Sequence, residues 1–210
     1  LKHFKKQVYW WFRQGEILRQ ANAVCFTTEE EKLLAQNTFW PSKFRSVVTG
    51  LGVEDPPAKN LQTEQELFGR FPGLKNKRIL LYLGRFHEKK GVDLLLNAWS
   101  RKPNDDEILV LAGPKTKDSH FIKLKNIASQ NAESIVWTGM LEGVQKWSML
   151  RMADALILPS HQENFGMVVA EALAVGKPVF MTDKVNLWRE VIESNAGYVD
   201  SDDQPGIDRL

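Results

Sequence analysis

The sequence is poor in cysteine, since Cys25 is the only one among 210 residues. A single thiol excludes an internal disulfide and suits a reducing compartment, so we expect a cytoplasmic protein, with the inner face of the membrane as the alternative location. No apolar run reaches the length of a spanning helix, and no signal-peptide pattern opens the chain. Lysine and arginine number 28 against 26 acidic residues. This balance predicts no nucleic-acid partner.

Motifs that bind metals or phosphates within one short segment are also missing. The four histidines are scattered and show no metal-ligand spacing. Neither a G-x-G-x-x-G nor a Walker A loop is present. Asp200-Ser201-Asp202 resembles the acidic D-x-D pair of metal-dependent sugar transferases, but it lies in a polar stretch and we interpret it as a solvated loop. We therefore expect no metal ion and no covalently bound cofactor.

The chain does contain a regular alternation of apolar and amphipathic segments after residue 77. The composition, 43% hydrophobic and 26% charged, is typical of a globular protein. Strands alternating with helices indicate βαβ crossovers, which predict an α/β fold: a Rossmann-like, three-layer α/β/α arrangement around a parallel sheet. Strands are expected at 79–83, 108–112, 134–138, 154–158, 178–182 and 197–199, and helices at 91–101, 118–130, 143–152, 164–175 and 186–194.

Pattern and composition divide the chain into three parts. From Val53 to Lys77 the alternation stops, and Pro-Pro and Pro-Gly pairs indicate a linker that contains a short helix at 63–70. The chain begins without methionine and stops within a polar, helix-like start, so we expect a piece of a longer protein. The expected parts are residues 1–55, the linker 56–77, and a sheet domain at 78–210 that is truncated at its end.

The first part opens with a basic amphipathic helix over residues 1–20. Packing against a neighbouring element is one interpretation of this helix, and peripheral contact with an anionic membrane is the other. Thr28 and Glu31 have the spacing of a capping box at the start of a later helix. Strand, helix and strand segments are expected at 23–26, 29–37 and 46–48.

Ligands of parallel sheets lie beyond the carboxyl ends of the strands, so the loops at those ends are the candidate sites. The first such loop has Gly84, Arg85 and Lys90. Cations beside the amides of a helix start favour the binding of a diphosphate. The alternative is that the cations only keep the loop solvated. Gly113 and Gly139 end the next two strands. Each is explained either by a ligand contact or by the turn itself.

Two carboxylates follow the fourth strand of the sheet domain: Glu163 lies in the loop, and Glu171 lies two turns into the helix after it. The amides of Asn164, Phe165 and Gly166 are expected to begin a helix, where anions bind favourably. Glu163 is therefore either a ligand-binding group or a helix cap. Glu171 has apolar neighbours and needs a polar partner, which ribose hydroxyls, a backbone amide or an exposed helix face would supply.

Together these segments resemble the GT4 family of retaining glycosyltransferases (glycosyl transferases group 1), which have the GT-B fold. Gly84-Arg85 followed by Lys89-Lys90-Gly91 is similar to the family's "GR…KKG" segment. The stretch from Glu163 to Glu171 matches its E-x7-E motif, with Asn164 where glycine is usual. Weaker similarities at 21–24 and 47–53 extend the resemblance over nearly the whole chain.

The resemblance implies a role for each matching residue. Arg85, Lys90 and Glu163 are the expected catalytic residues, because the two cations would neutralise the donor diphosphate without a metal and Glu163 would hold the donor sugar. Glu171 would hold the ribose. The other expected donor-binding residues are Gly84, Gly113, Gly139, Met140, Asn164, Phe165, Gly166 and Met167.

The family also implies an activity, namely transfer of a hexosyl group from a nucleoside diphosphate sugar to an acceptor hydroxyl, with retention of anomeric configuration. GT-B enzymes have two Rossmann-like domains, so residues 1–55 would be the end of the acceptor-side N-terminal domain and 78–210 the nucleotide-sugar-binding domain. The chain alone would bind donor without transferring sugar, and a carbohydrate or lipid-linked acceptor would bind the missing N-terminal portion. The alternatives are an epimerase or phosphorylase of the same architecture, and a non-catalytic sugar-nucleotide-binding module.

Overall fold

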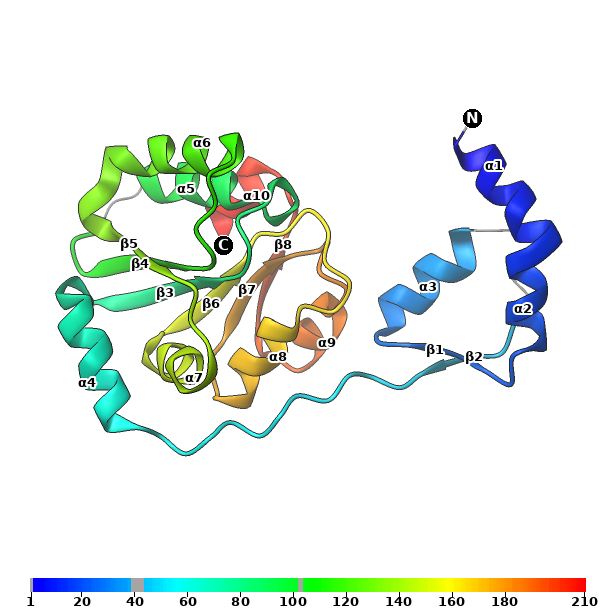
Figure 1. Cartoon of the computed structure of the whole chain (residues 1–210), viewed down its shortest axis with the longest axis horizontal. Helices are drawn as coiled ribbons and strands as arrows, with labels where there is room; N and C mark the ends of the chain where they lie inside the picture. Colours follow the sequence, from blue (N-terminus) through cyan, green and yellow to red (C-terminus); the bar gives the residue numbers. More distant parts are fainter. Residues whose placement is uncertain (1, 39–43, 102–103) are drawn as a thin grey trace. The chain divides into compact units, whose positions relative to one another are not determined.

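The computed structural model describes residues 2–38, 44–101 and 104–210. The chain forms two compact units, Leu1–Gly52 and Val53–Leu210 (Figure 1). Each unit has a parallel sheet of its own. Within the described ranges, no helix is both long enough and apolar enough to cross a membrane.

The first unit is a small α/β segment in which two short strands pair in parallel. The expected helix over 1–20 is present as helical segments joined by a π-helical stretch. The Glu31 amide donates to the Thr28 hydroxyl at 3.1 Å, which confirms the predicted helix cap. The elements are α1 (Lys2–Tyr9), the π-helical stretch (Trp10–Gln14), α2 (Gly15–Gln20), β1 (Val24–Phe26), α3 (Glu29–Thr38) and β2 (Ser46–Val48).

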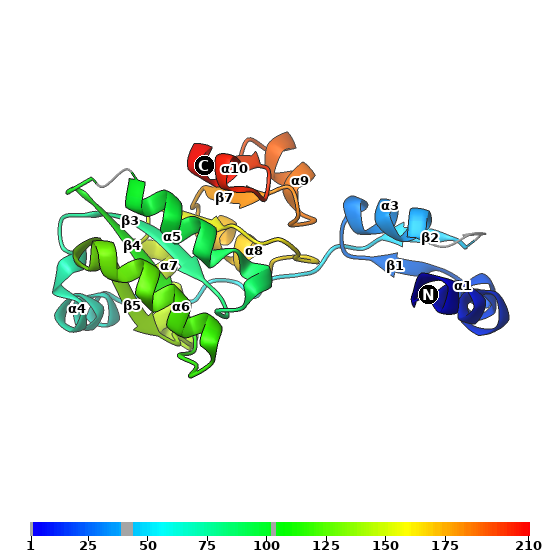
Figure 2. The ribbon, with the colours of Figure 1, turned by 90° about the horizontal axis from the view of Figure 1, so that it is seen from above.

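The second unit is built on a parallel sheet with the strand order β5-β4-β3-β6-β7-β8. Helices α5, α6 and α10 cover one face and α4, α7, α8 and α9 the other (Figure 1), and Figure 2 looks onto the α5–α6 layer. The three-layer α/β/α prediction is confirmed. The strands are β3 (Arg78–Leu83), β4 (Glu107–Ala112), β5 (Ile135–Gly139), β6 (Ala155–Leu158), β7 (Val179–Thr182) and β8 (Gly197–Asp200). The helices are α4 (Leu61–Arg70), α5 (Val92–Arg101), α6 (Ser119–Ala128), α7 (Gly143–Met152), α8 (Met167–Ala174), α9 (Trp188–Glu193) and α10 (Gln204–Arg209).

The core of this unit lies on both faces of the central strands. Leu81, Val110 and Leu156 are at most 1% exposed. A strand that is covered on both sides has no solvent-facing positions, so it is apolar at every position, with no alternation. This explains why the strands could be located from short apolar runs, with ends displaced by only a residue or two.

The expected linker over 56–77 needs a correction. Its second half is folded onto the sheet domain as α4 and a 3₁₀ turn at Pro72–Leu74. Leu67 and Leu74 are 2% and 1% exposed and belong to the core of the second unit. The Asn60 side chain accepts a hydrogen bond from the Thr63 amide at 3.0 Å and begins the helix. Few apolar positions anchor this segment, which is why its pattern resembled that of a linker.

The strand order gives this sheet a single point at which the direction of winding reverses. The chain runs outward from β3 through β4 to β5, then returns to β6 beside β3 and runs the opposite way through β7 to β8. The helices that follow β3 and β6 therefore cover opposite faces, and their loops diverge at the carboxyl edge. Ligands of doubly wound sheets bind at this switch point. The loops 84–91 and 159–166 lie there.

Substitution of Gly113 tests how closely the backbone is packed at this carboxyl edge. A Cβ atom on Gly113 would lie 2.0 Å from the Gly84 carbonyl oxygen, so one strand end would have to move. We expect Gly113→Ala to lower the free energy of unfolding by about 2–3 kcal/mol, as overpacking does elsewhere. Urea denaturation followed by circular dichroism measures it.

Gly69→Ala is the matched control, because Gly69 lies in α4 with no atom near the added Cβ. It should leave stability unchanged or raise it by about 0.5–1 kcal/mol, the helix preference of alanine over glycine. Equal effects of the two substitutions would show that the close approach at Gly113 is not a constraint.

Candidate functional site

Two loops touch at the carboxyl ends of β3 and β6. Gly91 has a φ of 61°, and a Cβ atom there would lie 2.1 Å from the Pro159 carbonyl oxygen. The His161 amide donates to the Lys89 carbonyl oxygen at 2.8 Å. Only glycine permits both this conformation and this approach. These contacts fix the distance between the backbones of the two loops.

Lys90 and Glu163 form an ion pair across these loops, although they are 73 residues apart in the sequence. Their side chains are 17% and 22% exposed, so the pair is largely screened from water. Beside it, Lys89 Nζ donates to Gln162 Oε1 at 2.9 Å. The cation predicted to bind diphosphate and the carboxylate predicted to bind sugar therefore form one cluster.

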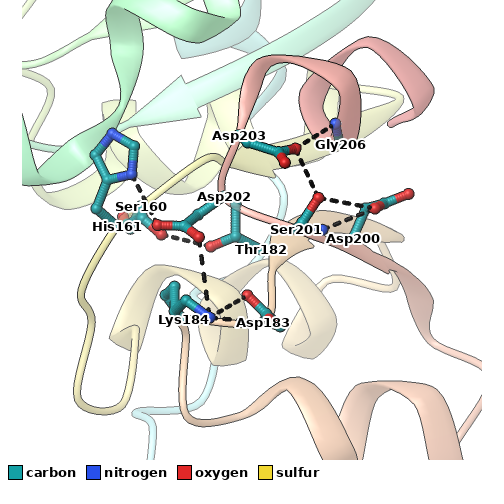
Figure 3. A network of polar contacts seen from close by, with 10 residues as sticks. All are labelled: Ser160, His161, Thr182, Asp183, Lys184, Asp200, Ser201, Asp202, Asp203 and Gly206. Carbon is teal, nitrogen blue, oxygen red and sulfur yellow. Dashed lines mark hydrogen bonds and ion pairs between the residues drawn. The ribbon is translucent and has the colours of Figure 1, made fainter.

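The backbone of Glu163 is held on its other side by the loop after β7. The Glu163 amide donates to the Lys184 carbonyl oxygen at 3.0 Å, and the Asn186 amide donates to the Glu163 carbonyl oxygen at 3.1 Å. The Thr182 hydroxyl donates to the Ser160 carbonyl oxygen, as Figure 3 shows. Glu163 thus sits on a short backbone ladder that joins two loops, which makes its position well defined.

The predicted start of the helix after Glu163 is wrong by three residues. Helix α8 begins at Met167, and Gly166, with a φ of 79°, is its N-cap. Asn164 and Phe165 therefore lie in the loop; Asn164 accepts a hydrogen bond from the Asn186 side chain at 3.2 Å, and Phe165 is 8% exposed. The amides that open the helix are those of Met167 and the residues after it. Met167 itself is 42% exposed at the site surface.

Glu171 has a partner that sequence reasoning missed. Lys146 Nζ on α7 lies 2.7 Å from Glu171 Oε1, and the two side chains are 23% and 15% exposed. Since α7 packs against α8, a lysine on the facing surface reaches the carboxylate. No local pattern points to Lys146, because the pairing depends on which helices are neighbours. Glu171 is thus satisfied without any of the three partners expected from the sequence.

Arg85 lies in the loop after β3, at the switch point, and is exposed. Its carbonyl oxygen accepts a hydrogen bond from the Tyr82 hydroxyl at 2.7 Å. Burial raises the pKa of Tyr82, and the negative charge of Glu163 raises it further, while Arg85 acts in the opposite sense. The phenol therefore remains a neutral donor that fixes the backbone of Arg85 and leaves the guanidinium toward solvent.

The three strand-end glycines lie side by side along the carboxyl edge. The Gly84 amide donates to the Ala112 carbonyl oxygen at 2.9 Å, and the Gly113 amide donates to the Gly139 carbonyl oxygen at 3.0 Å. The close backbone approach at Gly113 is a sufficient structural reason for that glycine. Met140, directly after Gly139, is 60% exposed. The structure brings these residues to the same edge as Arg85.

The acidic stretch 200–203 has structural partners. Both Asp200 oxygens accept hydrogen bonds from Arg209, at 2.6 and 2.7 Å, and the Asp203 side chain accepts from the Gly206 amide at 2.8 Å and caps α10. Asp202 contacts His161 (Figure 3). The stretch is therefore a connected polar network rather than the freely solvated loop we expected. Among the described residues, no cluster of three or more His, Cys, Asp or Glu side chains is placed to hold a metal ion.

Comparison with known proteins identifies the family of the chain. The family model described as "Glycosyl transferases group 1" matches residues 64–204, which include both site loops and both lysine–glutamate pairs. The chain belongs to this family. Its match to a D-inositol 3-phosphate glycosyltransferase of Xylanimonas cellulosilytica is 26% identical and covers 90% of the chain and 48% of that protein. A glycogen synthase of Mycobacterium tuberculosis is 32% identical over 56% of the chain and 29% of its own length.

Solved structures of glycosyltransferases have the same fold. A sucrose-phosphate synthase from Thermosynechococcus elongatus has a TM-score of 0.74 at 23% identity, over 93% of this chain and 49% of that one. Anabaena Alr3699/HepE in complex with UDP and glucose has a TM-score of 0.77 at 16% identity, over 97% and 56%. The D-inositol 3-phosphate glycosyltransferase and the sucrose-phosphate synthase each match most of this chain. The chain spans about half the length of these two relatives.

The Lys146–Glu171 pair should contribute measurably to the stability of this family member. We expect a double-mutant cycle with Lys146→Met and Glu171→Gln to give a coupling free energy of about 1–2 kcal/mol, because both side chains are mostly buried. Urea denaturation of the four proteins measures it. The matched control is Lys123–Asp93, a pair at 3.2 Å whose side chains are 61% and 24% exposed. Its coupling should stay below about 0.5 kcal/mol, and equal couplings would contradict the assignment.

The pH dependence of stability should reflect the bond between Asp200 and Arg209. Hydrogen bonds from Arg209 hold the pKa of Asp200 well below its ordinary value, with the Ser201 amide as a second donor. A carboxyl group with a lowered folded-state pKa stabilises the fold above its unfolded pKa of about 3.9 and loses this contribution as the pH falls through the folded value. Arg209→Met should raise the pKa of Asp200 toward that ordinary value, which carboxyl carbon-13 NMR would detect. An unchanged titration would contradict the assignment, and Lys75→Met is the charge-matched control.

Proposed function

We propose that this chain is the donor-binding part of a retaining glycosyltransferase that moves a hexosyl group from a nucleoside diphosphate sugar to an acceptor hydroxyl. The observation that supports it best is the contact of Lys90 with Glu163 at the switch point of the sheet. In this proposal Lys90 would bind phosphate and Glu163 would bind sugar hydroxyls, and a sugar linked to a diphosphate requires two such groups next to each other. Arg85 adds a second cation on the same loop.

Binding of the donor would give Lys90 and Glu163 new partners. Lys90 would turn from Glu163 to the diphosphate, and Glu163 would accept hydrogen bonds from the hydroxyls of the donor sugar. Each charged group keeps a polar partner in both states, so binding leaves no charge unsatisfied. Glu171, which Lys146 already contacts, would accept the ribose hydroxyls, and the backbone at Gly139 and Met140 would meet the base.

The chemical step requires stabilisation of the negative charge that develops on the leaving diphosphate. Arg85, Lys90 and the amides that open α8 would supply it, so we propose a reaction that does not need a metal ion. The acceptor oxygen would bond to the anomeric carbon on the face from which the diphosphate departs. The diphosphate would take the electron pair of the broken bond, and its departing oxygen would receive the proton of the acceptor hydroxyl. This order of events gives retention of configuration.

The remaining parts of the proposal concern the whole protein. The acceptor, a carbohydrate or lipid-linked carbohydrate, would bind a portion of the protein beyond the two units seen here, since the relatives are about twice as long. The chain alone would then bind donor without transferring sugar. We also propose a cytoplasmic location. Peripheral membrane contact through α1 and the following π-helical stretch is proposed because Phe4 and Phe12 are 69% and 77% exposed beside lysines and arginines.

Calorimetric titration of the chain with UDP, ADP and GDP tests the donor site. Anabaena Alr3699/HepE was solved with UDP, so UDP is the first probe. We expect micromolar to millimolar binding of at least one nucleotide. Lys90→Met and Arg85→Met should each weaken it about 10- to 100-fold, because each removes a charge-assisted contact to phosphate.

Lys75→Met is the matched control, since Lys75 is an exposed lysine at the opposite, amino edge of β3. It should bind as the unaltered chain does. Failure of the folded chain to bind any of the three nucleotides at millimolar concentration would count against the proposed function. In the intact protein, proton NMR of the product should show the anomeric configuration of the donor, and inversion would exclude the proposed reaction course.

A further inference from the structure

Asp202 lies between the two segments that hold Glu163. Its Oδ2 atom is 3.0 Å from His161 Nδ1, and its Oδ1 atom is 3.9 Å from Lys184 Nζ (Figure 3). His161 belongs to the loop after β6 and Lys184 to the loop after β7. One carboxylate, contributed by the segment between β8 and α10, therefore contacts both loops.

Each partner of Asp202 is linked to the Lys90–Glu163 pair by one backbone hydrogen bond. The His161 amide donates to the carbonyl oxygen of Lys89, the residue before Lys90, at 2.8 Å. The Lys184 carbonyl oxygen accepts from the Glu163 amide at 3.0 Å. A displacement of the His161 or Lys184 backbone would therefore move one member of the pair relative to the other. The Lys184 ammonium group also lies 3.0 Å from Asp183 Oδ1, and His161 is the shorter of the two links from Asp202.

The capping and anchoring of α10 are carried out by the sequence neighbours of Asp202. Asp203 caps α10 through the Gly206 amide, and Asp200 holds Arg209. The Asp202 side chain is 30% exposed, and ion pairs at that level of exposure contribute little to global stability. Its contacts are thus directed at the site loops and not at the fold as a whole.

We infer that Asp202 is a positioning residue of the donor site, which acts through His161 and Lys184 to set the place of Glu163 beside Lys90. The inference rests on the proposed function, because Glu163 is there the group that holds the donor sugar. Asp202 would act on Glu163 indirectly, since its own ion pairs are with His161 and Lys184. Its removal should therefore weaken recognition of the sugar more than recognition of the nucleotide.

The first experiment measures this split by calorimetry on the 210-residue chain with UDP and UDP-glucose. Asp202→Ala should weaken UDP-glucose binding about 10-fold, the effect of one lost hydrogen bond to a charged group, and UDP binding less than about threefold. Asp202→Asn keeps an oxygen that accepts from His161 Nδ1 and should recover most of the affinity. Asp105→Ala removes an exposed aspartate at the amino edge of β4 and should bind both probes as the unaltered chain does.

A second readout does not depend on nucleotide. When Asp202 accepts from Nδ1, the neutral His161 ring carries its proton on Nδ1, which long-range nitrogen-15 NMR distinguishes from the Nε2–H tautomer. Asp202→Ala should shift His161 toward the Nε2–H tautomer and speed exchange of the Glu163 amide hydrogen. Asp202→Asn and Asp105→Ala should preserve the tautomer and the protection of that amide.

The outcomes separate the inference from the proposed function. If the unaltered chain binds neither uridine probe, the comparison is made with ADP and ADP-glucose and with GDP and GDP-glucose. Failure of all three nucleotides to bind would contradict the proposed function, and the exchange of the Glu163 amide would still decide the role of Asp202. An Asp202→Ala chain with unchanged His161 tautomer and unchanged Glu163 protection would overturn the inference. So would an equal loss of UDP and UDP-glucose affinity accompanied by a lower melting temperature, which would indicate a purely structural residue.

Discussion

The contact between the loops that follow β3 and β6 is the constraint on which the site depends. These strands are neighbours in the sheet, yet the chain leaves them toward opposite faces. The loops can meet only because Gly91 has no Cβ to collide with the Pro159 carbonyl oxygen. With the backbones in contact, Lys90 and Glu163 are close enough to pair. A larger residue at position 91 would separate the groups that the proposed donor needs together.

The charges of the site are balanced before any ligand arrives. Glu163 is paired with Lys90 and Glu171 with Lys146, and all four side chains are less than a quarter exposed. A carboxylate so removed from water requires a partner, and each of these pairs supplies one. The same groups would match the phosphates and hydroxyls of a nucleotide sugar.

Much of the fold could be predicted from the sequence, because β3, β4 and β6 are covered on both faces and so appear as uninterrupted apolar runs. Three predictions were wrong for identifiable reasons. The helix after Glu163 begins only at Met167, because Gly166 takes a left-handed conformation that ends the loop. Residues 61–77 pack on the sheet domain through only a few apolar side chains. The acidic stretch near Asp202 forms a network whose partners come from the loop after β6 and from α10.

The sequence by itself determined the class of fold and supplied candidate site residues, since apolar periodicity and the spacing of Glu163 and Glu171 are local properties of the chain. Only the tertiary structure decided which charges pair. Lys90 reaches Glu163 across 73 residues, Lys146 reaches Glu171 across 25, and His161 reaches Asp202 across 41. The physical reason is that these pairs follow from strand order and from which helices share a face of the sheet. Neither property is expressed in the periodicity of any one segment.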